Sequence, residues 1–461
     1  MILPPPRAER INTPWTRKHL SFDPLIEQIR GWAEGLPDSR EGPDYTMADA
    51  IMSAFAMFSL KDPSLLAFQE RRNDENMKNL YRIRVIPSDT QMREIIDPLN
   101  PELLRPIFTR IFKEAQRGGA LEAFVFYEGY YLLALDGTEY FFSDSIHCPC
   151  CLCRESSTGK KSYYHQMLAG ALVKPGKREV LPVAPEPIVK QDGDNKNDCE
   201  SNAGKRFLRK FRAEHPRLPI IIVEDGLSSN APHIRLLKEL DMRFLLIVKE
   251  DDHEHLFEEV FRAHNENRAT CMSYEHPTEP GVTCEISFIH DLPLNKSNSD
   301  LRVNLLMYSE FASDGTRQKH FAWVTDLPIT EENAPTLVAG GRARWKIENE
   351  TFNTLKNQGY HFEHNYGHGK QNLSVVFAML MMLAFLVDQT QQHCCPLFQA
   401  NLKKAGSRRL LWERLRSHFY HFVFQSMREL LEAMLHDRVK EMPLPPRYPC
   451  NRMCSCHLPS G

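Results

Sequence analysis

The segment LPIIIVEDG at residues 218–226 is a continuous apolar run that ends on two acids and a glycine. A run of this kind is typical of a strand that is buried on both faces of a sheet. Helical patterns at 200–215 and 231–240 flank it, and RFLLIVKE at 243–250 is a further strand. Because strands and helices alternate here, we expect an α/β fold with helices on the faces of a mixed sheet.

Other parts of the chain have different patterns. We expect further strands within 124–142, 163–173 and 180–188, where apolar and aromatic residues gather between turn residues. Residues 1–125 have apolar residues at helical spacing, and residues 251–330 contain short strands separated by polar turns. The pattern predicts a helical N-terminal region, an α/β core and a β-rich insertion within that core.

The charge balance excludes a uniformly basic surface. The chain has 461 residues, with 57 lysines and arginines against 60 aspartates and glutamates and a formal net charge of -3. Any surface for nucleic acid must therefore be local. Two stretches at 71–84 and 105–117 are rich in arginine and lysine, and each is either a DNA-contacting face or a solvated charged face.

Neither export nor a membrane partner is expected. Pro4, Pro5 and Pro6 stand where a signal peptide would have its apolar run, so we expect a cytoplasmic protein. The apolar run at 374–387 is shorter than the roughly 20 residues that span a bilayer, which favours a buried core helix. In such a protein the 12 cysteines are expected to be thiols or metal ligands.

Two apolar strands end on an aspartate that is followed by glycine, namely Asp136 in YYLLALDG and Asp225 in IIIVEDG. A charge at the end of an apolar strand is costly unless it is paired, hydrated or bound to a metal. Ligands of α/β sheets also bind at the carboxyl ends of strands. Either aspartate alone is equally explained as a turn residue, because Asp-Gly is a common turn dipeptide.

The segment RWKIENETFNTLK at 344–356 is expected to form one helix with two glutamates. At roughly 100° per residue, Glu348 shares a face with Arg344, whereas Glu350 lies about 200° away from Glu348. Only one glutamate can point into a given site, and a solvated helix with incidental ion pairs is the alternative. If Glu348 meets both aspartates, the three carboxylates form a site for Mg²⁺ or Mn²⁺, and a pair of such ions supports phosphodiester chemistry.

The motifs LDGTEYF, VEDGLSSN and RWKIENETFNTLK occur in this order, with the β-rich insertion between the second and the third. Together they resemble the catalytic core of IS4-type DDE transposases, which has an RNase H-like fold. The resemblance implies that Asp136, Asp225 and Glu348 are the catalytic, metal-binding triad, with Mg²⁺ or Mn²⁺ as cofactor. Arg344 matches the arginine that precedes the family's glutamate. Lys356 lies one residue beyond the family's lysine, so a register set by that lysine would select Glu350.

The resemblance also implies an activity and partners. We expect a DNA transposase that cuts transposon ends and joins them to target DNA, acting as a homodimer in a synaptic complex on double-stranded DNA. Arg344 and Lys356 would bind DNA. The alternatives are a metal-dependent nuclease of the same fold and a non-enzymatic, DNA-binding regulatory derivative. The expected division of the chain is 1–125 for binding terminal inverted repeats, 126–250 for the first part of the core, 251–330 for the insertion, 331–392 for the rest of the core and 393–461 for a basic helical tail with a cysteine-containing end.

The segment HFEHNYGHGKQN at 361–372 follows this helix. His368 and Lys370 lie among glycines, and we expect them to contact DNA near the scissile phosphate. A glycine-rich turn with solvent-exposed histidines is the alternative.

The segment IHCPCCLCR at 146–154 contains two overlapping C-x2-C pairs, a spacing that suits two ligands of a tetrahedral zinc ion. A structural Zn²⁺ site is therefore expected, and a loop with crowded thiols is the alternative. The candidate ligands in this segment are His147, Cys148, Cys151 and Cys153. The other half of the site is left open between Cys199 and the tail residues Cys450, Cys454, Cys456 and His457.

Overall fold

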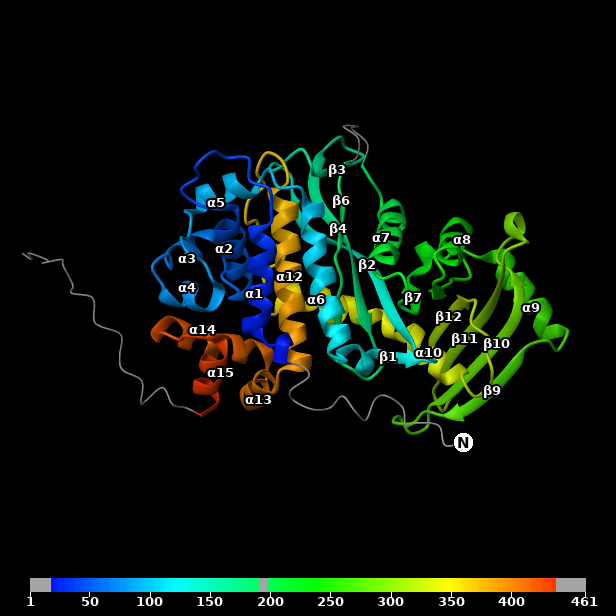
Figure 1. Cartoon of the computed structure of the whole chain (residues 1–461). Coiled ribbons are helices and arrows are strands. Elements are labelled where there is room, and N and C mark those ends of the chain that lie inside the picture. The colour runs from blue at the N-terminus through cyan, green and yellow to red at the C-terminus, as the bar shows by residue number, and fades with distance from the viewer. Residues whose placement is uncertain (1–17, 191–196, 437–461) are drawn as a thin grey trace, which may run out of the picture.

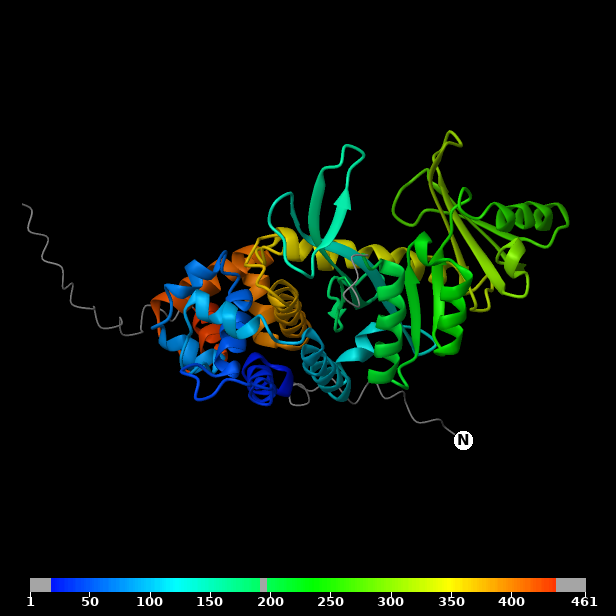
Figure 2. The ribbon, with the colours of Figure 1, turned by 90° about the horizontal axis from the view of Figure 1, so that it is seen from above.

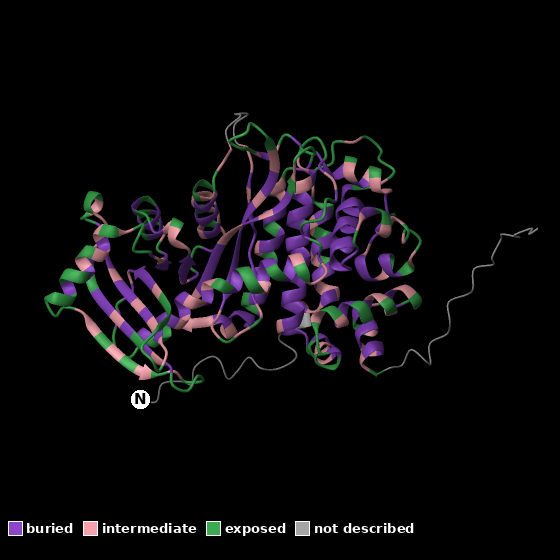
Figure 3. Ribbon diagram, turned by 180° about the vertical axis from the view of Figure 1, so that it is seen from behind, coloured by how far each residue is buried: buried purple, intermediate pink, exposed green. Residues whose placement is uncertain are grey.

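The computed structural model describes residues 18–190 and 197–436. Seen from above, a helical body, an α/β region and a group of antiparallel strands follow one another along the molecule (Figure 2). The side chains between the layers are buried in the helical body and in the sheet alike (Figure 3). The mixed α/β class expected from the sequence is confirmed.

The helical body combines helices from both ends of the chain (Figure 1). Six helices come from the N-terminal region, and several begin at a side chain that caps the first turn, as Thr46 and Ser88 do. The ten helices are α1 (Phe22–Glu34), α2 (Met47–Ser59), α3 (Leu65–Gln69), α4 (Glu75–Tyr81), α5 (Asp89–Ile96), α6 (Arg105–Arg117), α12 (Leu373–Cys394), α13 (Pro396–Ala405), α14 (Arg408–His421) and α15 (Met427–His436).

Helix α12 lies at the centre of this body and contacts α1, α2, α5, α6 and α13. It is long and apolar enough to cross a membrane, but 94% of its most apolar window is buried inside the protein. Asp97 caps its N-terminal end, since the carboxylate accepts hydrogen bonds from the backbone N–H groups of Lys370, Gln371 and Leu373. The buried core helix expected at 374–387 is therefore confirmed.

A buried ion pair joins an N-terminal and a C-terminal segment of the helical body. The fully buried Lys61 pairs with Asp388 of α12, and its Nζ lies 3.3 Å from the ring centroid of Trp412 in α14. The hydroxyl of Tyr360 donates to the same carboxylate. Burial lowers the pKa of Lys61 to about 8, while Asp388 opposes this shift. Because an unpaired buried charge is costly, α12 and the segment after α2 depend on each other.

The α/β region is built on a parallel set of strands with an antiparallel partner. β2 pairs antiparallel with β4 and parallel with β7, and β7 pairs parallel with β8. Helix α7 packs on β4 and β6, α8 on β8, and α10 on β8 and β11. The elements are β1 (Val125–Tyr127), β2 (Tyr130–Ser143), β3 (Leu152–Glu155), β4 (Lys161–Val173), β5 (Leu181–Pro182), β6 (Glu186–Ile188), α7 (Glu200–Glu214), β7 (Ile220–Glu224), α8 (Ala231–Glu239), β8 (Arg243–Ile247), α10 (Ala334–Arg342) and α11 (Asn353–Asn357).

The β-rich segment expected at 251–330 continues the same sheet. Its strands follow β8 in the order β12, β11, β10, β9, all antiparallel, so that β12 pairs directly with β8. The segment also contains a helix that packs on β10 and that the sequence analysis did not predict. The elements are α9 (Glu254–Asn265), β9 (Thr270–Glu275), β10 (Thr283–Pro293), β11 (Arg302–Phe311) and β12 (Arg317–Thr325).

Candidate active site

Strand register brings Asp136 and Asp225 to the same edge of the parallel strands. Ala134 of β2 pairs with Val223 of β7, and each aspartate lies two residues further along its strand. Asp225 follows the end of β7, where its carboxylate accepts a hydrogen bond from the N–H of Leu227 at 3.1 Å. Asp136 does not end its strand as expected, since β2 continues to Ser143. The neighbouring strand β7 ends beside Asp136, so β2 has no β7 partner from this residue onwards.

The segment at 344–356 is not one regular α-helix. A 3₁₀ turn at Ala343–Trp345 leads into a π-helical turn at Ile347–Phe352 and then into α11. Such π turns are rare and occur often at functional sites. The expectation of a uniform 100° per residue is wrong here because a π turn holds more residues than an α turn.

The two glutamates of this segment face different neighbours. Glu348 pairs with Arg344, with 2.7 Å between Oε1 and Nη2, and its side chain is 50% exposed. The carboxylate of Glu350 lies 3.6 Å from Nη1 of Arg408 at the start of α14. Arg344 also approaches Oδ2 of Asp136 at 3.4 Å. Arg344 thus connects Glu348 with the aspartate, whereas Glu350 points towards the helical body.

The pKa of Asp136 is shifted by burial and by the charged groups around it. Burial raises the pKa of Asp136 to about 7; Arg344 opposes this shift, and the carboxylates of Glu348, Glu200 and Asp225 add to it. Burial and nearby negative charges both favour the protonated form of a carboxyl group. The guanidinium of Arg344 is the only positive group among these causes, so the site has an excess of negative charge.

Glu200 is a fourth acid that the sequence analysis missed. It is the first residue of α7 and receives a hydrogen bond from the N–H of Gly137 and another, at 3.4 Å, from Nε2 of Gln166. Burial raises the pKa of Glu200, and the charge of Asp225 adds to this. A Cβ atom at position 137 would lie 2.3 Å from Oε2 of Glu200. Gly137 therefore does not make the turn expected of Asp-Gly; it makes room for Glu200.

The acids at this edge form a donor set that suits a hard divalent cation. Carboxylate oxygens are the ligands that Mg²⁺ and Mn²⁺ prefer, and three other acids act on Asp136 against one arginine. Within residues 18–190 and 197–436, the triad is not among the groups whose ligand atoms all lie within 4.8 Å of one another. Arg344 pairs with both Asp136 and Glu348 and so lies between these two carboxylates.

The predicted DNA contacts after the π turn have different outcomes. Lys356 pairs with Glu363 at 2.8 Å. Lys370 is exposed. His368 is buried, with its ring centroid 4.0 Å from that of Phe141, which argues against a direct contact with DNA. His361 and His364 are exposed, as the alternative of a turn with exposed histidines expects.

The basic stretches of the N-terminal region are largely paired within the chain. In the first stretch, Arg71 pairs with Asp62 at 3.0 Å and Arg82 with Glu27 at 3.3 Å. In the second, Arg105 pairs with Glu214 of α7 at 2.8 Å. Arg110 and Lys113 of the second stretch are exposed, so this stretch keeps basic side chains on the surface.

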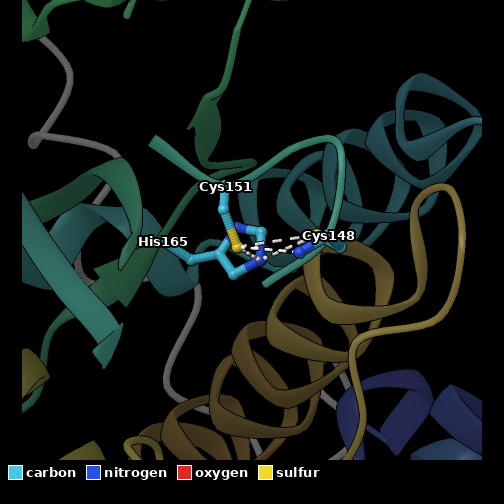
Figure 4. A group of neighbouring side chains, drawn as sticks. All are labelled: Cys148, Cys151 and His165. Atoms are coloured by element: carbon cyan, nitrogen blue, oxygen red, sulfur yellow. Dashed lines mark hydrogen bonds between the residues drawn. The ribbon is translucent and has the colours of Figure 1, made fainter. Parts of the chain in front are cut away.

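A second cluster, of cysteine and histidine, lies further along the β2–β4 hairpin. Cys148, Cys151 and His165 are all buried and point towards one another (Figure 4). Burial lowers the pKa of His165 to about 3, and His368 adds to this, so that its imidazole is neutral. A histidine on a strand was not predicted as a ligand, although its position in the apolar pattern YYHQMLAGALV was a signal of burial.

The other predicted zinc ligands lie elsewhere. The ring of His147 stacks on that of Tyr163 with centroids 4.3 Å apart, and the thiol of Cys153 faces the carbonyl of Arg154 at 3.8 Å. Cys199 is exposed at the start of α7. The four tail candidates are outside the described residues. The four-residue set expected at 146–154 is thus corrected, and only Cys148 and Cys151 of it face a common point.

Comparison with known proteins identifies the class. The family model of the transposase DDE domain matches residues 152–386, just over half of the chain, so the protein belongs to the DDE transposase family. Enzymes of this family cut and join DNA and generally use divalent metal ions. The match includes Asp225 and Glu348 and begins after Asp136. No curated protein matches the chain.

Proposed function

We propose that this protein is an IS4-type transposase whose core has the RNase H-like topology. The strand order supports this fold, because β4, β2, β7 and β8 adjoin with one antiparallel and two parallel pairings. In this proposal β9 to β12 are an insertion that extends the sheet on the far side of β8. The helical body, with its basic residues, would bind the terminal inverted repeats, and two copies would hold two transposon ends together.

The catalytic group in this proposal is Asp136, Asp225 and Glu348. The carrying observation is geometric: the β2–β7 register brings Asp136 and Asp225 to one edge of the sheet, and Arg344 pairs with both Asp136 and Glu348. Asp136, Asp225 and Glu348 would together hold a pair of divalent ions. Such a pair of Mg²⁺ or Mn²⁺ ions activates the attacking hydroxyl and stabilises the leaving oxygen of a phosphodiester.

The protein groups around the acids would position the DNA. Arg344 pairs with Asp136 and Glu348 in the structure, and its guanidinium would donate to a phosphate oxygen of the bound DNA. Lys356 would bind a phosphate further along the strand if the DNA displaces Glu363. Positioning of this kind is the main contribution of a protein to in-line phosphoryl transfer.

The test uses the DNA that flanks the reading frame. Short inverted repeats in that DNA supply the candidate ends, and cleavage of these ends with Mg²⁺ is expected from the parent protein. Glu348→Gln should abolish cleavage while Glu350→Gln, the matched control on the same π turn, should cut normally. The reverse result would move the catalytic role to Glu350 and contradict the proposed triad.

The same proteins and DNA ends distinguish the transposase from the two alternative functions. A nuclease of this fold would cut the ends but would not join a pre-cut 3′-hydroxyl end to a second DNA molecule. A regulatory derivative would bind the ends without any Mg²⁺-dependent cutting. The presence of all three acids argues against the regulatory derivative, and the match to the transposase DDE domain supports the transposase; a nuclease would share the triad, so the joining assay separates these two.

A further inference from the structure

We propose that Cys148, Cys151 and His165 bind a structural zinc ion, with His368 as the fourth ligand. The site lies on the β2–β4 hairpin beyond the catalytic acids and is separate from them. Cys148 and Cys151 belong to the connection between β2 and β3, His165 to β4, and His368 to the loop that follows α11. The ion would therefore hold three segments together.

The distances within the cluster match the edges of a zinc tetrahedron. The two sulfur atoms are 3.7 Å apart, and each lies 3.3 Å from Nε2 of His165. With Zn–S near 2.3 Å and Zn–N near 2.0–2.1 Å, tetrahedral geometry places two sulfurs about 3.8 Å apart and a sulfur and a nitrogen about 3.5 Å apart. Thiolate and imidazole ligands select zinc and disfavour Mg²⁺, so this site and the carboxylate site prefer different ions.

His368 is the best placed residue to complete the site. Its ring centroid is 5.1 Å from that of His165, and its Nε2 is buried without a hydrogen-bond partner in the part of the chain that the structure describes. Its Nδ1 lies 3.1 Å from Oδ1 of Asn365. If Nδ1–H donates to this amide oxygen, Nε2 carries the free lone pair, which is how ligand histidines are oriented in metal sites.

Cys150 is the competing fourth ligand. Its thiol donates to the carbonyl of Gln371 at 3.0 Å and also interacts with the thiol of Cys148, so it lies beside the cluster with a partner outside it. In the structure His368 lies next to the three-residue group and does not yet belong to it. Gly367 and Gly369 have φ values of +128° and +63°, and they place His368 on a sharply curved loop over the hairpin. A small movement of this loop brings Nε2 to the open corner of the tetrahedron.

The full-length protein, expressed with added zinc, provides the test. We expect one equivalent of zinc per chain by elemental analysis and an X-ray absorption spectrum that fits two sulfur and two nitrogen ligands. Cobalt substitution should give the absorption bands of tetrahedral thiolate ligation. Three or more sulfurs in the first shell, or the absence of zinc from the wild-type protein, would overturn the proposal.

Variants assign the ligands. The double variant Cys148→Ser/Cys151→Ser should lose the zinc, whereas Cys153→Ser and Cys271→Ser, the matched controls, should retain it. His368→Ala should weaken Co²⁺ binding by at least about tenfold to a hundredfold, because the loss of a ligand costs no less than the loss of a residue that only supports one. Cys150→Ser should leave Co²⁺ binding unchanged. Co²⁺ binding that is weakened by Cys150→Ser and not by His368→Ala would contradict the assignment of the fourth ligand. Circular dichroism shows that each variant compared is folded.

Discussion

Two clusters of potential metal ligands lie on one β-hairpin and differ in almost every physical respect. In the β2–β4 ladder, Asp136 pairs with Ala169 and Phe141 pairs with His165. His165 lies four residues before Ala169 in β4, so the two clusters are separated along the strand by about 13 Å at the usual rise per residue. The acids lie apart at an open edge, and Glu348 is half exposed. Cys148, Cys151 and His165 are buried and within contact of one another.

The difference fits the roles that we propose for the two clusters. A site that admits DNA must stay open, and its like charges remain apart until cations and a polyanion arrive. A site that only holds segments together can be closed, because neutral thiols and an imidazole can be buried at little electrostatic cost. We therefore expect changes at the acids to alter activity and changes at the cysteines to alter stability.

The largest expected effect is on cleavage. Asp136→Asn removes the carboxylate that both other acids of the triad act on, and we expect cleavage of transposon ends to fall by at least about a thousandfold, since metal-assisted catalysis supplies several kcal/mol. Gel-based cleavage assays with Mg²⁺ measure this loss. Zinc content should stay at the parent level, and a simultaneous loss of zinc would show that the two clusters are not independent.

The next effect is on stability. Removing zinc with a strong chelator should lower the melting temperature of the parent protein by several degrees, because the ion connects three segments that are otherwise held by weaker contacts. The Cys148→Ser/Cys151→Ser variant should melt at one temperature with and without chelator. Restoration of the parent's melting temperature by Mg²⁺ instead of Zn²⁺ would contradict the separation of the two clusters.

A third effect is a pH dependence that comes from Asp136. The pKa of this carboxyl group is raised from 3.8 to about 7 in the folded protein. Its contribution to stability is therefore fully present below pH 4 and is lost as the pH rises to about 7, with an upper limit of about 1.4 kcal/mol per pH unit. Urea unfolding without divalent ions should show a steeper fall between pH 5 and 7 for the parent than for Asp136→Asn. Equal slopes would show that Asp136 titrates normally.

The smallest expected effect is at Glu200. Its carboxylate adds to the pKa shift of Asp136 and is held by Gly137 and Gln166. Glu200→Gln keeps the shape and removes one negative charge, so we expect about a tenfold fall in cleavage at limiting Mg²⁺ that is recovered at higher Mg²⁺. A loss as large as that of Asp136→Asn would place Glu200 within the essential catalytic group.

Several elements were predictable from the sequence because their patterns are strong. The apolar runs at 218–226 and 163–173 gave the central strands, and the run at 374–387 gave the core helix. Asp136 and Asp225 come to one edge because their strands are parallel neighbours. The sequence shows the same pattern at both, an apolar run followed by an aspartate and a glycine, although only Asp225 follows the end of its strand.

Other features depend on contacts that no local pattern encodes. Glu at the first position of a helix is common, since it complements the helix dipole, so Glu200 gave no signal of a site. His165 meets Cys148 only because a loop folds back over β4. The π turn at Ile347–Phe352 has no sequence signature that separates it from an α-helix. The short strands after α9 were predicted. That they extend the sheet of the parallel strands was not, because this depends on the pairing of β12 with β8.

The ion pair between Lys61 and Asp388 connects residues separated by more than three hundred positions. During synthesis, the early helices leave the ribosome long before α12 can supply the carboxylate or the apolar surface that they need. A truncated product that stops before α12 would expose that surface and be open to degradation. The helical body can therefore be completed only after α12 has been synthesised.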